Sequence, residues 1–191
     1  PIKSRQRQMC IRDRRQETGA FVRKFIAYVP QGNTLFSGTV RENLQMGRED
    51  ASEEELWAAL KLASGENFVR SLPEGLDTVI GSSGTRLSGG QAQRLALART
   101  LAHPRPVLVL DDPFSALDRN TEDTVFANLQ EYAKDKVVFL ISHRLYHFPQ
   151  MRSVIFMEDG KATVGTHGEL MASVPVYRQL YESQAGGQAH E

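Results

Sequence analysis

The sequence is poor in cysteine, in long hydrophobic runs and in net charge. Cys10 is the one cysteine among 191 residues, which excludes an intramolecular disulfide and fits a reducing compartment. The most apolar stretches, Pro106–Leu110 and Val137–Ile141, have the length of strands and fall far short of the ~20 residues that a membrane helix needs. The 23 basic residues balance 23 acidic ones, so composition gives no electrostatic basis for binding nucleic acid.

The first 15 residues differ in composition from the rest of the chain. They contain six basic residues and one acid without periodicity, which predicts a disordered basic arm. A second interpretation is that Gln8–Asp13 (QMCIRD) translates CAG ATG TGT ATA AGA GAC, a transposon end used in preparing sequencing libraries, so that residues 1–15 are a non-native leader. We expect the domain to span residues 16–184, followed by a disordered tail over 185–191.

Strand and helix patterns alternate through the rest of the chain. Strands are predicted at Phe25–Pro30, Val107–Leu110 and Lys136–Ile141, and a hairpin at Arg152–Val164. Two of these strands, Val107–Leu110 and Lys136–Ile141, contain continuous apolar runs, which are typical of strands buried on both faces of a sheet. Capping residues and helical spacing predict the helices, which are Thr39–Met46, Ser52–Ala63, Ser88–Ala102, Arg119–Tyr132, His167–Ser173 and Val176–Ser183.

This alternation implies an α/β fold with a parallel sheet covered on both faces. Residues 33–91 hold mostly helix and loop, so we expect a helical lobe there and a second lobe over residues 92–184. No internal repeat is visible in the sequence.

One motif, Leu87–Gln91, reads LSGGQ at the predicted start of a helix. Ser88 suits an N-cap, and Gly89 and Gly90 carry no side chains, so backbone N–H groups there could lie against a phosphate. A helix N-terminus adds about half a positive charge, which favours an anion. Taken alone, the pentapeptide fits a plain Ser-capped helix equally well.

A second motif places two acids, Asp111 and Asp112, at the end of the apolar strand that begins at Val107. Parallel-sheet enzymes bind ligands at the carboxyl ends of strands, where a carboxylate can hold Mg²⁺ directly or through water. A turn or N-cap acid before Pro113 is the alternative interpretation.

Three further motifs surround these two: Gln31 in YVPQ precedes them, and Ser115–Asp118 (SALD) and His143 in LISHRL follow. In this order the five resemble the Q-loop, signature, Walker B, D-loop and switch histidine of the ABC transporter nucleotide-binding domain, from about Val22 to Ser183. LFSGTVREN and LPEGLDTVIG resemble exporter-type members. The resemblance implies a P-loop NTPase (RecA-like) parallel sheet flanked by helices, with an ABC-specific helical subdomain.

Members of that family pair head to tail and hold ATP between two domains, which implies roles for the motif residues. Asp111 and Gln31 would hold Mg²⁺, while Asp112, His143 and Gln31 would serve hydrolysis. The expected nucleotide contacts are Ser88, Gly89, Gly90, Gln91, Ser115, Asp118 and His143.

The chain departs from the family pattern in two ways. No G-x-x-x-x-G-K-[ST] loop occurs, so we expect the chain to begin after the P-loop and to bind ATP poorly by itself. Asp112 stands where most members have a catalytic glutamate, and its side chain is one methylene shorter. Because a base must reach its water, we expect a slow or degenerate site. Exporters of this family that are built from two different halves often pair such an impaired acid with a sound signature in one half, so the resemblance implies one half of a heterodimeric exporter.

The expected partners are a second nucleotide-binding domain and a transmembrane domain of the same full-length chain, at the cytoplasmic face of the plasma (inner) membrane. No nucleic-acid partner is expected. Two alternatives remain open, a soluble non-transport ABC ATPase and an inactive truncated product. We expect Tyr28 to pack rather than to stack on nucleotide, and Arg94 and Arg99 to be solvated or salt-bridged.

Overall fold

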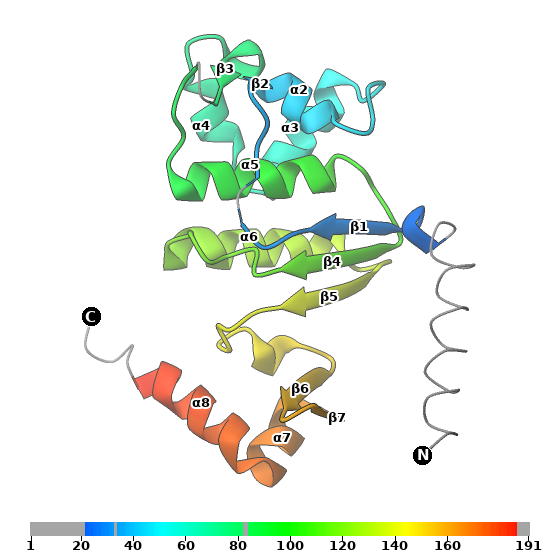
Figure 1. Ribbon diagram of the computed structural model, residues 1–191, viewed down its shortest axis with the longest axis vertical. Coiled ribbons are helices and arrows are strands. Elements are labelled where there is room, and N and C mark those ends of the chain that lie inside the picture. Colours follow the sequence, from blue (N-terminus) through cyan, green and yellow to red (C-terminus); the bar gives the residue numbers. More distant parts are fainter. Residues whose placement is uncertain (1–21, 33, 82–83, 187–191) are drawn as a thin grey trace, which may run out of the picture. The chain divides into compact units, whose positions relative to one another are not determined.

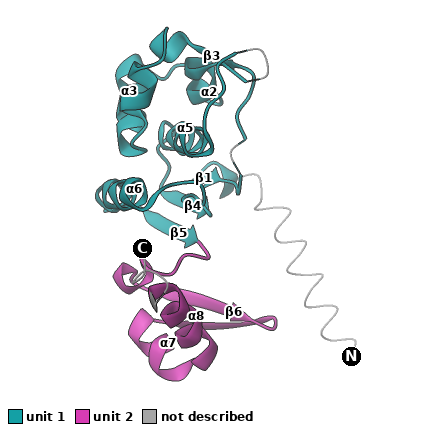
Figure 2. Ribbon diagram, turned by 90° about the vertical axis from the view of Figure 1, so that its left-hand side faces the viewer, with its two compact units in different colours: residues 1–141 teal, residues 142–191 magenta. Residues whose placement is uncertain are grey.

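A computed structural model describes residues 22–32, 34–81 and 84–186 of the chain. The chain divides into two compact units, residues 1–141 and residues 142–191 (Figure 2). The predicted leader, with Cys10, lies outside the described residues, as do residues 187–191. The last helix extends over Ala185 and Gly186, the first two residues of the predicted tail.

The first unit is built on a three-stranded parallel sheet with the order β1-β4-β5 (Figure 1). The register aligns Val29 with Leu110, and Leu110 in turn with Leu140. Parallel neighbours require long crossovers, and helices supply them here, which confirms the predicted α/β class. The strands are β1 (Ile26–Val29), β4 (Val107–Asp111) and β5 (Val137–Ile141).

The two apolar strands β4 and β5 differ sharply in burial. In β4 every second residue is buried, and Leu110 is 1% exposed. In β5 Val137 and Ile141 are 54% and 53% exposed. The prediction of a strand buried on both faces is therefore wrong for β5, because within the described residues it pairs only with β4 and forms an edge.

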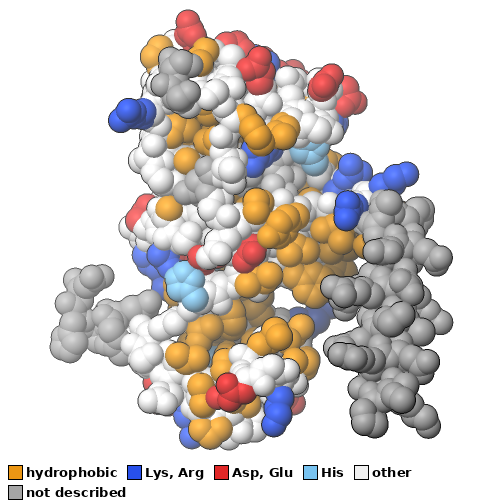
Figure 3. Space-filling model, in the orientation of Figure 1, with side chains coloured by type: hydrophobic (Ala, Val, Ile, Leu, Met, Phe, Trp, Pro, Cys, Tyr) orange, Lys and Arg blue, Asp and Glu red, His pale blue; other side chains and the backbone are white. Residues whose placement is uncertain are grey.

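One face of this sheet is apolar and exposed. Tyr28, Val109 and Phe139 are aligned across the three strands, and Tyr28 and Phe139 are 52% and 48% exposed. Figure 3 shows apolar side chains gathered over the strands. Helix α5 packs against β1, whose Ala27 and Val29 are buried. For the described residues the prediction of cover on both faces is therefore wrong, because Tyr28 and Phe139 on this face remain about half exposed.

A group of helices lies between β1 and β4, and the lobe boundaries at residues 33–91 and 92–184 stay a prediction. The last helix of this group, α5, packs against α2, α3 and β1 and so connects the lobe to the sheet. A short antiparallel pair, β2 with β3, was not anticipated. The elements are β2 (Gly38–Thr39), α2 (Val40–Gln45), α3 (Glu53–Leu62), α4 (Glu66–Arg70), the 3₁₀ helix η1 (Gly75–Asp77), β3 (Val79–Ile80) and α5 (Gly89–Leu101), with α6 (Arg119–Tyr132) following β4.

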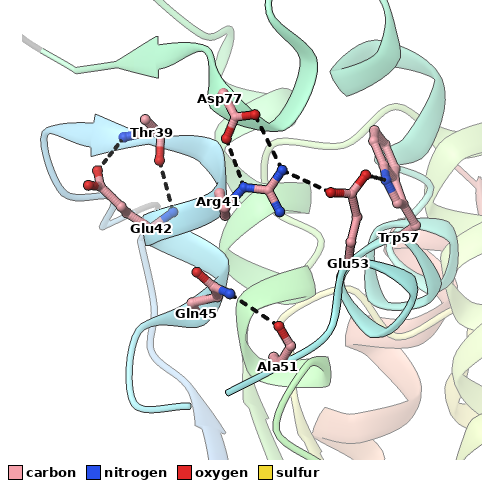
Figure 4. Close-up of polar contacts among 8 residues, drawn as sticks. All are labelled: Thr39, Arg41, Glu42, Gln45, Ala51, Glu53, Trp57 and Asp77. Atoms are coloured by element: carbon pink, nitrogen blue, oxygen red, sulfur yellow. Dashed lines mark hydrogen bonds and ion pairs between the residues drawn. The ribbon is translucent and has the colours of Figure 1, made fainter. Parts of the chain in front are cut away.

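Arg41 joins three elements of the lobe (Figure 4). Its Nε donates to Asp77 Oδ1 at 2.7 Å, and its Nη2 donates to Glu53 Oε2 at 3.0 Å. Trp57 Nε1 donates to the other oxygen of Glu53 at 3.2 Å. The Trp57 and Arg41 bonds lower the pKa of Glu53, and the Arg41 bond lowers that of Asp77. These bonds fix α2, α3 and η1 relative to one another.

The second unit contains the predicted hairpin and the two predicted closing helices. Its core is formed by Leu145, Val154, Leu170 and Tyr177. No helix of the described residues is long and apolar enough to span a membrane. The elements are the 3₁₀ helix η2 (Phe148–Gln150), β6 (Val154–Glu158), β7 (Lys161–Gly165), α7 (His167–Ser173) and α8 (Pro175–Gly186).

Candidate functional site

The LSGGQ motif forms the N-terminus of α5, as the sequence predicts. Ser88 has an extended backbone and caps the helix: its Oγ accepts from Gln91 N–H at 3.2 Å, and Gln91 Oε1 accepts from Ser88 N–H at 2.9 Å. This reciprocal pair is a capping box. No acidic residue lies in the first turn, so the positive end of the helix is not neutralised by the helix itself.

One of the two glycines of the motif, Gly90, has a packing role that the sequence did not reveal. A Cβ at Gly90 would lie 2.9 Å from Ala116 O, and one at Gly89 would lie 3.6 Å from Ala116 Cβ. A side chain at Gly90 would therefore push the loop after β4 away from α5. Small size at this position is required by a neighbour in the same chain, in addition to any approach of a phosphate.

Asp111 ends β4 and has a partner on the neighbouring strand. Tyr28 Oη donates to Asp111 Oδ2 at 3.1 Å, and this bond raises the pKa of the Tyr28 hydroxyl. The sequence predicts a packing role for Tyr28 and does not predict this contact. The strand register would have revealed it, because Tyr28 aligns with Val109, and Asp111 lies two residues further on the same face.

Asp112 is held in a left-handed backbone conformation, with φ of 50°, and is 7% exposed. Its N–H donates to Ile141 O at 2.8 Å, which fixes the turn to the end of β5. A non-glycine residue with positive φ is uncommon, and aspartate and asparagine adopt it more readily than most. The conformation therefore offers a local reason for aspartate at this position.

Gln93 connects α5 to the turn after β4 and was not singled out from the sequence. Its side chain is buried, at 4% exposed. The amide Nε2 donates to Asp112 O at 3.1 Å and to Ser115 Oγ at 3.0 Å, and Oε1 accepts from Ala116 N–H at 2.7 Å. The structure thus connects α5, the helix that begins at the signature motif, to Asp112 and Ser115.

Asp118, predicted to contact nucleotide, caps α6. Its Oδ1 accepts from Thr121 N–H at 3.0 Å and its Oδ2 from the Thr121 hydroxyl at 2.7 Å. These bonds lower the pKa of Asp118. Its carboxylate is therefore engaged in a local cap, and the nucleotide role of Asp118 stays a prediction.

The two arginines of α5 bind backbone carbonyls of the helical lobe. Arg94 donates to Ser64 O at 2.8 Å and to Gly90 O at 3.2 Å. Arg99 donates to Thr34 O at 2.9 Å. Burial lowers the pKa of both guanidinium groups. These bonds connect α5 to the loops of the helical lobe that contain Thr34 and Ser64. The two arginines are therefore not simply solvated surface charges.

The remaining predicted residues lie at strand ends. Gln31 occupies an exposed bend that follows β1. His143, exposed and two residues past β5, belongs to the second unit. Its main-chain oxygen accepts from Gln184 Nε2 of α8 at 2.7 Å, and Gln184 Oε1 accepts from Leu145 N–H at 2.9 Å. The backbone of the His143 segment is thus held by the last helix.

The donor set at the end of β4 fits Mg²⁺ held together with a nucleotide. Residues 22–32, 34–81 and 84–186 contain no group of three or more His, Cys, Asp or Glu that could hold a metal ion. Asp111 offers one carboxylate at the end of a parallel strand. Magnesium in phosphate-transfer sites is commonly held by one or two carboxylates together with water and phosphate oxygens, so a single carboxylate fits that arrangement.

Comparisons with known proteins agree with this geometry. The ABC transporter family profile matches residues 4–115. The "Probable multidrug resistance ABC transporter ATP-binding/permease protein YheI" of Bacillus subtilis (strain 168) is 42% identical over 164 residues, which cover 85% of this chain and 28% of that protein. An ATP-binding/permease protein of Staphylococcus aureus (strain Mu50 / ATCC 700699) is 40% identical over the same length.

The fold matches a solved structure as well. A bacterial Atm1-family ABC exporter with ATP bound superposes with a TM-score of 0.80 at 35% identity, covering 85% of this chain and 29% of that one. The chain thus spans somewhat over a quarter of the length of the proteins it matches. The match confirms the predicted P-loop NTPase fold. The chain belongs to the ABC transporter family.

Proposed function

We propose that this chain is the ATP-binding part of an ABC exporter, in which two such domains pair head to tail and hydrolyse ATP to drive export. The observation that carries the proposal is the N-terminus of α5, where Ser88 is capped by the neutral Gln91 and the first turn holds no acid. The helix's partial positive charge is therefore available to an anion. A γ-phosphate presented by a second domain has the charge that this terminus favours.

The end of β4 would serve the chain's own ATP. Magnesium bound there by Asp111 and Gln31 would neutralise charge on the phosphates. Asp112 would orient and deprotonate the attacking water, and His143 would donate a hydrogen bond to the γ-phosphate, which imidazole can do in either protonation state. Ser115, whose hydroxyl Gln93 already contacts, and Asp118 would approach the nucleotide from the loop that follows.

The membrane part of the proposal rests on the relatives, whose names join an ATP-binding and a permease function in one protein. We infer a transmembrane domain in the same full-length chain, with this segment at the cytoplasmic face of the plasma (inner) membrane. Multidrug resistance and export in those names favour outward transport.

We further propose that this chain is one half of a heterodimer whose own ATP site is weak. Asp112 is one methylene shorter than glutamate, and a misplacement of about 1 Å can cost about a hundredfold in rate. The signature motif, by contrast, has its full cap and would serve the ATP site of the other half. A weak catalytic acid in this chain's own ATP site, combined with an intact signature motif for the other ATP site, favours a transporter built from two different halves.

Asp112→Glu tests this weak site in the complete transporter with its mate. A longer carboxylate that reaches the water should raise the turnover of ATP at this chain's own site by about tenfold or more. Turnover is measured with the mate's own catalytic acid replaced, so that one site is observed. An unchanged or lower turnover in Asp112→Glu would count against a degenerate site. It would instead favour the left-handed backbone at position 112 as the reason for an aspartate there.

Ser88→Tyr tests the main proposal. A bulky side chain at the N-terminus of α5 should obstruct the approaching phosphate and lower ATPase turnover by about a hundredfold. Ser52→Tyr is the matched control, because Ser52 caps α3 with the same reciprocal bonds, at 2.8 and 3.3 Å. Equal losses in both variants, or none in Ser88→Tyr, would refute a nucleotide role for this helix terminus.

A further inference from the structure

Three side-chain hydrogen bonds from one buried residue connect the signature helix to the turn that carries the acids. Gln93 lies one helical turn after the start of α5 and is 4% exposed. Both ends of its amide are used: Nε2 reaches Asp112 O and Ser115 Oγ, and Oε1 receives Ala116 N–H at 2.7 Å. A buried amide with its donors and its acceptor satisfied is held in one orientation.

The same two segments are also in direct packing contact. The Cα of Gly90 approaches the loop so closely that an added Cβ would meet Ala116 O at 2.9 Å. Leu117 Cδ2 would lie 3.7 Å from the same Cβ. Hydrogen bonds from Gln93 and close packing at Gly90 therefore act at neighbouring points on one face of α5.

The turn bound by Gln93 contains Asp112, whose left-handed backbone conformation is unfavourable by itself. Asp112 has a φ of 50°, and left-handed residues other than glycine cost of order 1 kcal/mol or more unless the surroundings fix them. Asp112 N–H is fixed by Ile141 O, while Asp112 O is fixed by Gln93. The two bonds hold the peptide groups on both sides of this residue and so set the direction of its side chain.

We propose that Gln93 is a positioning residue for ATP hydrolysis, which makes the N-terminus of α5 and the turn Asp112–Ala116 one rigid joint. This inference rests on the proposed function. Because the α5 terminus would contact the ATP of the other domain, while Asp112 acts on the chain's own ATP, the joint transmits a displacement at one nucleotide to the catalytic carboxylate at the other.

The test compares Gln93→Met with Gln45→Met in the complete transporter. Methionine preserves length and volume and removes the three bonds. Gln45 is the matched control, because its Nε2 also joins a helix to a loop carbonyl, Ala51 O at 3.1 Å (Figure 4), away from the motif residues. Steady-state ATPase kinetics, measured with the mate's own catalytic acid replaced so that one site is observed, give kcat and KM, and hydrogen exchange gives the protection of the Ala116 amide.

We expect Gln93→Met to lower kcat by about tenfold or more with KM changed by less than about threefold, and to accelerate exchange at Ala116 by about tenfold. Gln45→Met should change neither. An unaltered kcat in Gln93→Met, or an equal loss in Gln45→Met, would overturn the inference.

If Gln93→Met does not fold, hydrogen exchange of the Ala116 amide in the unmodified protein still tests the inference. An Ala116 amide that exchanges as fast as an exposed loop amide would refute the joint. An unmodified protein without ATPase activity would refute the proposed function instead, and exchange at Ala116 would still report on the joint.

Discussion

The N-termini of α3 and α5 have the same local structure and opposite electrostatic character. Ser52 with Glu55 and Ser88 with Gln91 form capping boxes with the same reciprocal bonds. The first turn of α3 adds two more glutamates, at positions 53 and 54, whereas α5 has two glycines there. In α3 the positive end of the helix is neutralised by its own carboxylates, and in α5 it is not.

This difference shows that helix capping and anion binding are separable. A neutral amide at the third position satisfies the cap as well as a carboxylate does, and it leaves the charge of the helix dipole free. The glycines add a second requirement, since Gly90 must also fit against Ala116. The following changes either abolish the contrast between the two helices or measure it.

Gln91→Glu should have the largest effect. It converts the α5 cap into the α3 type, so stability is retained while a carboxylate occupies the end of the helix. We expect ATPase activity of the complete transporter to fall by about a hundredfold, because a like charge would face the phosphate. Glu55→Gln is the reciprocal control and should leave turnover unchanged. Full activity in Gln91→Glu would remove the electrostatic basis of the proposed function.

Gly90→Ala should come next, with an effect on stability. Alanine is a better helix former than glycine by about 1 kcal/mol, so helix propensity alone predicts stabilisation. The contact with Ala116 O reverses this expectation, and we predict a destabilisation of about 1 to 3 kcal/mol. Urea unfolding measures the change, with Gly168→Ala on α7, where an added Cβ meets nothing within 4 Å, as the control. Stabilisation at both sites would contradict the packing role.

Ser88→Ala and Ser52→Ala should have similar, smaller effects on stability. Each removes one capping oxygen and should cost about 1 kcal/mol in the free energy of unfolding. The two caps share their geometry, so a difference of more than about 1 kcal/mol between the variants would show that they are not equivalent. Thermal unfolding of both variants beside the parent protein is sufficient.

The smallest effect is a dependence on pH that only α3 should show. The Arg48 bond, together with the backbone of Ser52, lowers the pKa of Glu55 below its usual 4.5. A lowered folded-state pKa gives stability that is present above the unfolded value and is lost as pH falls through the folded one. The protection factors of the amides in the first turn of α3, which compare exchange with the intrinsic rate at each pH, should therefore fall below about pH 4.5, and those of α5 should not. An equal fall in both helices would contradict this cause.

Local signals predicted the helices and caps, while contacts between distant segments escaped the sequence. The start of α5 at Ser88 follows from residues three positions apart, and it was predicted correctly. The contacts of Gln93 with Asp112 and Ala116 depend on which loop packs against α5, and no spacing in the sequence encodes that. Burial of β5 was predicted wrongly for the same reason, since Val137 to Ile141 is as apolar a run as Val107 to Leu110 but has one neighbouring strand, where β4 has two, among the described residues.

Gln184 gives the end of this chain an unexpected importance. It stands in the closing turns of α8, far in sequence from every nucleotide motif, yet it accepts from Leu145 N–H and donates to His143 O. Shortening the polypeptide before position 184, a common choice when a tag is added or a boundary is trimmed, would release both backbone groups. A boundary that spares all the recognisable motifs would still loosen the support of the histidine.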